Sequence, residues 1–296
     1  MLNAAFAAAL IFLTVDEPCS VKVDDRTEVM LTLRSDSVRI DWTCAEDNME
    51  YVNSFYGKPR WDVWNGEAVE CSFSPYGREG SNAMGNPDYR LLSNPSNNFF
   101  SAFRGERILF SPFTSKTVRR EKNWSVSWCI PFSALETFGG PDVSDEKASL
   151  PGNIWTFKFS RRTETEGKKS SVSSPIMLLK IPEEVIAPYR RIVLAGCRSA
   201  ETGEVGHVMI SCDLYNTMEK DFTGKAVLRL LAGEEISILK EIELQIPSGE
   251  SVRFDQTVSL PKKAVKFRIQ AVIEDSNGLP IRISRDLPIE NPWVVF

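Results

Sequence analysis

Residues Arg60 to Phe73 read RWDVWNGEAVECSF, an aromatic-rich approach that leads directly into an alternating segment. One face of that segment carries only apolar side chains, Val69, Cys71 and Phe73. This period of two predicts a half-buried strand, with Glu70 on the opposite face and pointing away from the core. A sugar ring stacks on a flat indole while its hydroxyls need fixed polar partners, so Trp64 beside Glu70 suggests a saccharide site. The alternative is that Trp61 and Trp64 are core residues.

The composition limits the kinds of protein that this chain can be. Its 296 residues are enough for two domains of ordinary size, each with its own core. Hydrophobic residues make up 42% and charged residues 25%, which is typical of globular proteins and excludes a disordered chain. A net charge of -5 gives no overall attraction for nucleic acids or acidic membranes, so we expect no nucleic-acid partner.

Cysteine and histidine usage argues against metal and thiol chemistry. The cysteines are Cys19, Cys44, Cys71, Cys129, Cys197 and Cys212. They include no CxxC pair and no spacing typical of a zinc site, so the sequence predicts no metal ligands and no disulfide framework. The single histidine, His207, excludes a Ser-His or Cys-His pair within the first 200 residues. We interpret it as structural.

The apolar N-terminal segment, Ala4 to Val15, has two interpretations. It is about as long as the apolar region of a signal peptide and is too short to span a bilayer, so no membrane insertion is expected. No Lys or Arg precedes it, and no clear small-residue cleavage site follows it. The sequence therefore favours a strand or buried edge segment of the fold over the remnant of an export signal.

Alternating segments recur through the first two thirds of the chain. Thr27 to Arg34 and Val38 to Cys44 flank the turn residues Ser35-Asp36-Ser37 and predict an antiparallel hairpin. Further strands are predicted at Tyr89 to Ser93, Asn98 to Phe103, Trp124 to Ile130, Ile154 to Arg162 and Ile176 to Leu179. Polar loops are predicted at Ala45 to Lys58 and Thr163 to Ser174. No helical period extends over ten residues, so we predict an all-β fold, with a β-sandwich over residues 1–182.

The last third of the chain has fewer aromatic residues and more regular strands. Ile181 to Arg191, with two prolines and a charge cluster, is interpreted as the linker. Six strands are predicted beyond it, at Val208 to Leu214, Lys225 to Leu231, Ile236 to Ile246, Ser251 to Val258, Val265 to Glu274 and Ile281 to Ile289. This spacing predicts an immunoglobulin-like β-sandwich over residues 190–296, without site chemistry of its own.

Four parts of the first domain resemble the family 9 carbohydrate-binding modules and their DOMON-like relatives. They are TEVMLTLRSDSVRIDWTCAED (27–47), VWNGEAVECSFSP (63–75), YRLLSNPSNNFFSAF (89–103), and WSVSWCIPFSAL (124–135) with PGNIWTFKFSRR (151–162). The resemblance implies a sandwich fold that holds a sugar against tryptophan. It places Trp64 as the stacking residue, Glu70 as a sugar-binding carboxylate and Arg90 as a sugar-binding arginine.

Two hypotheses about function follow. The first is non-catalytic binding of a mono- or oligosaccharide, in the recognition or breakdown of polysaccharides. The second is a structural or interaction β-sandwich that has lost the sugar site. The resemblance implies a second tryptophan in the loop before the last strand, and Thr163 to Ser174 contains no aromatic residue.

Catalysis and cofactors are not expected from this sequence. Glu67 and Glu70, three apart in a strand, should face opposite sides and so cannot form a glycosidase pair. Glycoside hydrolysis is expected from another domain or chain. No cofactor is predicted, although the resemblance implies that a structural calcium ion can be present. Haem, as in some DOMON relatives, would need Met84 as a ligand. Relatives are commonly exported, which implies a periplasmic or extracellular location.

Overall fold

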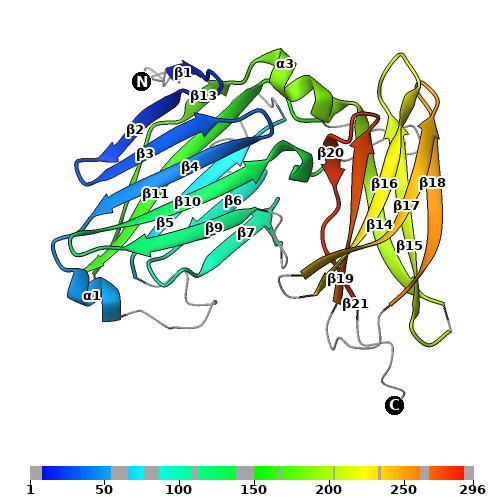
Figure 1. Cartoon of the computed structure of the whole chain (residues 1–296). Helices are drawn as coiled ribbons and strands as arrows, with labels where there is room; N and C mark the ends of the chain where they lie inside the picture. Colours follow the sequence, from blue (N-terminus) through cyan, green and yellow to red (C-terminus); the bar gives the residue numbers. More distant parts are fainter. Residues whose placement is uncertain are drawn as a thin grey trace, which may run out of the picture. The chain divides into compact units, whose positions relative to one another are not determined.

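The structure, a computed structural model, describes residues 9–54, 66–76, 87–108, 113–137, 150–165, 168–202, 204–232, 235–260 and 267–289. Strands dominate these residues, which confirms the all-β prediction. The chain divides into two compact units: unit 1 is Met1–Pro131 with Gly152–Val185, and unit 2 is Phe132–Pro151 with Ile186–Phe296. Each unit is built from two sheets (Figure 1).

Within the described residues, unit 1 has one sheet of eight strands and one of five. The larger sheet has the order β1 (Ala9–Phe12), β13 (Met177–Lys180), β11 (Ile154–Thr165), β5 (Ala68–Ser74), β6 (Tyr89–Ser93), β7 (Phe99–Phe103) and β8 (Glu106–Arg107), and β12 (Lys168–Ser173) pairs with β11. The smaller sheet has the order β2 (Pro18–Asp24), β3 (Thr27–Leu33), β4 (Ser37–Ala45), β10 (Asn123–Pro131) and β9 (Thr114–Arg119). The predicted hairpin is confirmed as the antiparallel pair β3 and β4.

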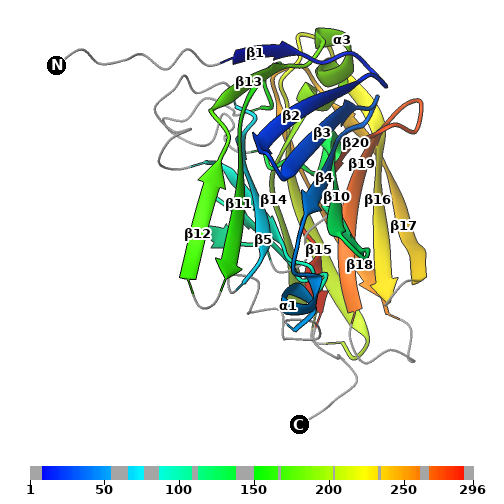
Figure 2. The ribbon, with the colours of Figure 1, turned by 90° about the vertical axis from the view of Figure 1, so that its left-hand side faces the viewer.

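The core of unit 1 lies between these two sheets, which Figure 2 shows as separate layers. The predicted alternation in β10 is confirmed, because its inward residues, Trp124, Val126, Trp128 and Ile130, are all fully buried. Contacts join the layers: the ring centroids of Trp42 and Phe159 lie 5.4 Å apart, edge to face. The indole N–H of Trp128 donates to the hydroxyl of Ser93 at 2.8 Å. Large aromatic side chains therefore fill the space between the sheets.

Two predicted loops of unit 1 are wrong. Helix α1 (Met49–Ser54) lies inside the stretch predicted as a polar loop, and its Val52 is buried. The Thr163 to Ser174 stretch is not a loop either, because β11 extends to Thr165 and β12 returns along it. Hydroxyl pairs link these two polar strands, with Ser160 and Ser173 2.8 Å apart. Such a strand carries no apolar alternation, which is why the sequence pattern missed it.

The N-terminal strand is an edge strand of the larger sheet. Residues Ala9–Phe12 pair in parallel with β13, which confirms a strand for the described part of this segment. Its side chains are not buried, since Leu10 is 47% and Phe12 67% exposed. The ammonium of Lys180 lies 5.3 Å from the centroid of the Phe12 ring.

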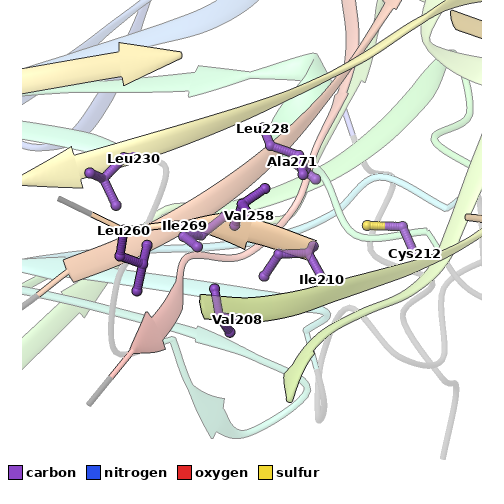
Figure 3. Packing of buried hydrophobic residues seen from close by; sticks show 9 residues of the cluster. All are labelled: Val208, Ile210, Cys212, Leu228, Leu230, Val258, Leu260, Ile269 and Ala271. Atoms are coloured by element: carbon purple, nitrogen blue, oxygen red, sulfur yellow. The ribbon is translucent and has the colours of Figure 1, made fainter. Parts of the chain in front are cut away.

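Unit 2 also forms a sandwich of two sheets. One has the order β14 (Ile192–Glu201), β15 (His207–Asn216) and β18 (Ser251–Ser259). The other has the order β17 (Glu235–Ile246), β16 (Phe222–Ala232), β19 (Phe267–Asp275) and β20 (Pro280–Ile283), with β21 (Leu287–Ile289) paired to β19. Figure 3 shows the buried cluster that residues of both sheets form, with Ile210 and Val258 from one and Leu228 and Ile269 from the other. Five of the six predicted strands are present; the sixth, Ile281 to Ile289, is divided into β20 and β21, and β14 was missed.

The remaining helical segments are single turns. The stretch predicted as the linker contains α3 (Glu183–Ile186) and the 3-10 turn η3 (Ala187–Arg190), with Ile186 and Tyr189 buried. Another single turn, η2 (Phe132–Ala134), follows β10 directly. In the described ranges no helix has both the length and the apolar character needed to cross a membrane.

Candidate functional site

Glu70 lies in the middle of the larger sheet of unit 1, on the face turned away from the core. Strand β5 runs between β11 and β6, and Glu70 pairs across them with Ser160 and Leu92 (Figure 1). The guanidinium Nε of Arg90 lies 3.0 Å from Glu70 Oε1, and Arg162 Nη2 donates to Glu70 Oε2 at 2.5 Å. The structure therefore brings the predicted residues Glu70 and Arg90 together and adds Arg162 to them.

Strand register explains this cluster. Ser72 pairs with Arg90 on β6, and Ala68 pairs with Arg162 on β11, so both arginines are diagonal neighbours of Glu70 on one face. Diagonal neighbours in a sheet are within reach of long side chains. Arg162 was not assigned to the site from the sequence, although its parity in β11 places it on the face opposite Trp155, Phe157 and Phe159.

Glu70 points away from the core, as predicted, but it is not surrounded by solvent. Its side chain is only 9% exposed, whereas those of Arg90 and Arg162 are 43% and 32% exposed. The hydroxyl of Ser72 donates a longer hydrogen bond of 3.4 Å to Glu70 Oε1. Both carboxylate oxygens of Glu70 are thus engaged by protein groups, so its main role is to hold two guanidinium groups on the sheet face.

The outer face of the larger sheet also carries basic and apolar residues next to Glu70. Lys158 pairs with Ser72 across β11 and β5, which places a third cation on this face. Leu92 pairs with Phe100 on β7, and the guanidinium carbon of Arg107 lies 5.8 Å from the centroid of the Phe100 ring. The face therefore combines one engaged carboxylate, several N–H donors and an apolar flank. We call Glu70, Arg90, Lys158 and Arg162 the basic face cluster.

Several residues singled out from the sequence lie outside the described residues. They are Trp61, Trp64 and Met84. The described chain resumes at Gly66, whose N–H donates to Glu164 Oε2 at 3.0 Å. Gly66 has a φ of 80°, a conformation that favours glycine, so it suits the start of β5. The role of Trp64 therefore remains a prediction.

Glu67 belongs to a second network, on the opposite side of the sheet from Glu70. Arg161 Nη2 lies 2.8 Å from Glu46 Oε2 and 3.3 Å from Glu67 Oε2. Arg161 Nη1 also donates to the hydroxyl of Thr27 and to the carbonyl of Ala45. The side chains of Arg161 and Glu67 are only 2% and 4% exposed. Glu67 and Glu70 thus serve different networks, and the prediction that they face opposite sides is confirmed.

Burial makes the charge of Glu67 costly. It raises the pKa of Glu67 above its ordinary value of 4.5, and the Arg161 guanidinium opposes that shift. A carboxyl with a raised pKa binds its proton more tightly in the folded state. Its contribution to stability is therefore present below the unfolded pKa and is lost as the pH rises through the folded pKa.

Glu67→Gln is expected to change the stability of unit 1 in a pH-dependent way, so that the variant compares more favourably with wild type at pH 7 than at pH 4. The amide keeps the shape of the side chain and never ionises, so it avoids the cost that wild type incurs as the pH rises. Denaturant unfolding of both proteins at several pH values, followed by tryptophan fluorescence, measures this difference. If the difference in unfolding free energy between the two proteins is the same at every pH, the raised pKa of Glu67 is contradicted.

The described residues contain no group of three or more His, Cys, Asp or Glu side chains placed to hold a metal ion. The neighbouring carboxylates Glu46 and Asp47 pair with Arg161 and Arg26. Carboxylates that are already paired with arginines are weak starting points for a calcium site.

Comparisons with known proteins do not assign the chain to a family. No protein-family model and no curated protein matches it. A β-glucuronidase from Bacteroides uniformis aligns with 86% of the chain and 26% of its own length, at 7% identity and a TM-score of 0.29. A DUF3823 family protein from Bacteroides ovatus aligns with 76% of the chain and 89% of its own length, at 8% identity and a TM-score of 0.30.

A DUF4785 family protein from Legionella pneumophila aligns with 90% of the chain and 58% of its own length, at 10% identity and a TM-score of 0.25. The chain spans about a quarter of the length of the glucuronidase. TM-scores this low carry no inference about activity or ligand. What the structure itself establishes is a chain of two all-β units, each with two sheets enclosing a core.

Proposed function

We propose that unit 1 is a non-catalytic carbohydrate-binding domain, and that the saccharide lies on the outer face of the larger sheet at the basic face cluster. This proposal rests on one observation: Glu70 forms ion pairs with both Arg90 and Arg162 on that face. The resemblance to family 9 modules, with Trp64 as the stacking residue, supports the same face. The same resemblance implies an exported, periplasmic or extracellular protein.

The chemistry of the cluster favours an acidic saccharide. Its exposed polar groups are N–H donors, since both Glu70 oxygens already accept hydrogen bonds or ion pairs from the protein. Three cations surround one carboxylate, so the face has a net positive charge. Arginine forks bind carboxylates in a bidentate manner and also reach vicinal hydroxyls. A sugar that carries a carboxylate, such as a uronic acid, fits this set better than a neutral sugar.

Calorimetric titration of the full chain with glucuronate, galacturonate oligomers, glucose and cello-oligosaccharides tests the proposal. We expect acidic saccharides to bind more tightly than neutral ones, and the affinity to fall with added salt. Arg90→Gln should weaken binding about tenfold or more, because one charge-assisted hydrogen bond is lost. Trp64→Ala should weaken it by a smaller factor, which reflects lost stacking.

Arg39→Gln is the matched control for Arg90→Gln. Arg39 Nε pairs with Asp41 Oδ2 at 2.7 Å on the outer face of the smaller sheet, and its side chain is 49% exposed. The control therefore removes an equivalent ion-paired guanidinium without touching the cluster. If Arg39→Gln and Arg90→Gln weaken saccharide binding equally, the ligand does not bind at the basic face cluster.

A structural or interaction role is the second candidate, and the engagement of both Glu70 oxygens favours it. Ion pairs of this kind can also serve only to hold neighbouring strands together. In that case none of the saccharides binds, and Arg90→Gln changes stability without any change in binding. Binding of neutral sugars alone would retain the carbohydrate function and overturn the preference for an acidic ligand.

A further inference from the structure

Two cysteines of unit 2 face each other on neighbouring strands. Cys197 of β14 is paired in register with Cys212 of β15. Directly opposite residues in an antiparallel pair have Cα atoms about 4.5–5.5 Å apart, which lies inside the range of about 4.4–6.8 Å that a disulfide requires. Their sulfur atoms are 2.7 Å apart, closer than two non-bonded sulfur atoms normally approach. Backbone and side chains are thus already arranged for a bond.

The two thiols differ in their surroundings. Cys212 is fully buried, at one end of the apolar cluster that also contains Ile210 and Leu228 (Figure 3). Cys197 is only partly buried and lines a pocket of unit 2 with Thr137 and Ser284. Cys197 therefore borders the pocket, whereas Cys212 is buried and does not line it.

Hydrogen bonding makes Cys197 the more acidic of the pair. The contact with Cys212 lowers the pKa of Cys197, and Ser284 acts in the same direction, whereas burial opposes them. The same contact and burial raise the pKa of Cys212. A thiolate is the attacking form in disulfide exchange, so Cys197 is the first of the two to react.

We propose that Cys197 and Cys212 form a disulfide bond by exchange with a small disulfide such as oxidised glutathione. The Cys197 thiolate attacks one sulfur of the reagent, forms a mixed disulfide and releases one thiolate. The Cys212 thiol then loses its proton and displaces the second thiolate, which completes the bond. Two protein thiols are oxidised, and one reagent disulfide is reduced to two thiols.

This bond would join β14 and β15 across a short loop and restrict the unfolded state of unit 2. Of the six cysteines, all of which lie in the described residues, only these two make a sulfur–sulfur contact. All six cysteines are free in the structure, as the sequence predicts, and the proposed bond goes beyond that prediction because cysteine spacing alone does not show strand register. A stable bond would also fit an oxidising compartment.

The test treats the folded full chain with oxidised glutathione and counts thiols after denaturation. Wild type is expected to lose at least two of its six free thiols, with a cross-linked peptide that contains Cys197 and Cys212, and dithiothreitol should restore all six. The thermal midpoint of unit 2 should rise on the order of 10 °C on oxidation. Six remaining thiols, or a bond between other cysteines, would overturn the proposal.

Variants separate the two steps of the exchange. Cys212→Ser should keep Cys197 reactive and trap it as a stable mixed disulfide with one glutathione. Cys197→Ser should keep the Cys212 thiol free, because Cys212 is buried. Cys129→Ser, which removes a partly buried cysteine of unit 1, should still form the bond. If Cys212→Ser does not fold, Cys212→Ala provides the same measurement. If a folded variant forms no mixed disulfide at Cys197, Cys197 is not the first of the two thiols to react.

Discussion

Arg161→Met is expected to lower the free energy of unfolding of unit 1 by about 3–5 kcal/mol, the cost of removing one partner from a buried ion pair. Arg161 is 2% exposed and contacts both Glu46 and Glu67, so its loss leaves carboxylates without their counter-ion. Methionine retains much of the volume of the side chain, which isolates the loss of charge and hydrogen bonds from the effect of a cavity.

Arg162→Met is the matched control for this change. The two arginines are sequence neighbours in β11, but Arg162 lies on the opposite face, is 32% exposed and pairs with Glu70. An ion pair that is partly exposed contributes on the order of 1 kcal/mol or less. Arg162→Met should therefore destabilise unit 1 much less than Arg161→Met does.

Tryptophan fluorescence during denaturant unfolding provides the measurement. Six of the seven tryptophans belong to unit 1, so the signal reports mainly on that unit. Adding Glu67→Gln to Arg161→Met should recover part of the lost stability, because one unpaired carboxylate is removed. If Arg161→Met and Arg162→Met lower the free energy of unfolding by the same amount, the buried ion pairs of Arg161 do not contribute the expected stability to unit 1.

Strands could be predicted from the sequence where one face is buried, because apolar and polar residues then alternate along the strand. Strand β10 alternates between tryptophan or aliphatic residues and small polar ones, and its position and inward face were correct. Strand β12, KKSSVS, is exposed at every position, so no hydrophobic pattern marks it. Its position follows from pairing with β11, a long-range contact that local propensity does not encode.

The candidate site was predicted in part for the same reason. Strand parity placed Glu70 on the outer face and the resemblance to family 9 modules suggested Arg90, and the structure brings the two within 3.0 Å. Parity does not show that a second arginine from β11 reaches the other carboxylate oxygen, because that depends on the register between β5 and β11. Pairing between strands far apart in sequence likewise hid the buried role of Arg161, whereas the contact between Cys197 and Cys212 depends on the register of the hairpin β14–β15, whose first strand was missed.

Gly224→Ala is expected to destabilise unit 2 by about 3 kcal/mol or more, at or above the usual cost of overpacking. A Cβ at Gly224 would lie 2.2 Å from the backbone oxygen of Glu274 and 2.7 Å from Cζ of Phe222. The oxygen belongs to β19, which pairs with β16, so the two strands would have to separate locally. Phe222 cannot easily yield, because its ring packs in a buried cluster with Leu244 and Ile246.

Gly196→Ala supplies the contrast within the same unit. Gly196 also lies in a strand, but its added Cβ would approach nothing closer than Asp213 Oδ2 at 3.5 Å, an ordinary contact. Hydrogen–deuterium exchange followed by mass spectrometry reports on each unit separately, because it resolves individual peptides. Gly224→Ala should accelerate exchange in peptides from β16 and β19 of unit 2. Exchange in peptides from β4 and β10 of unit 1 should not change. Because alanine adds the same methyl group at both positions, equal exchange in the two variants would mean that the close approach of β16 and β19 does not limit the stability of unit 2.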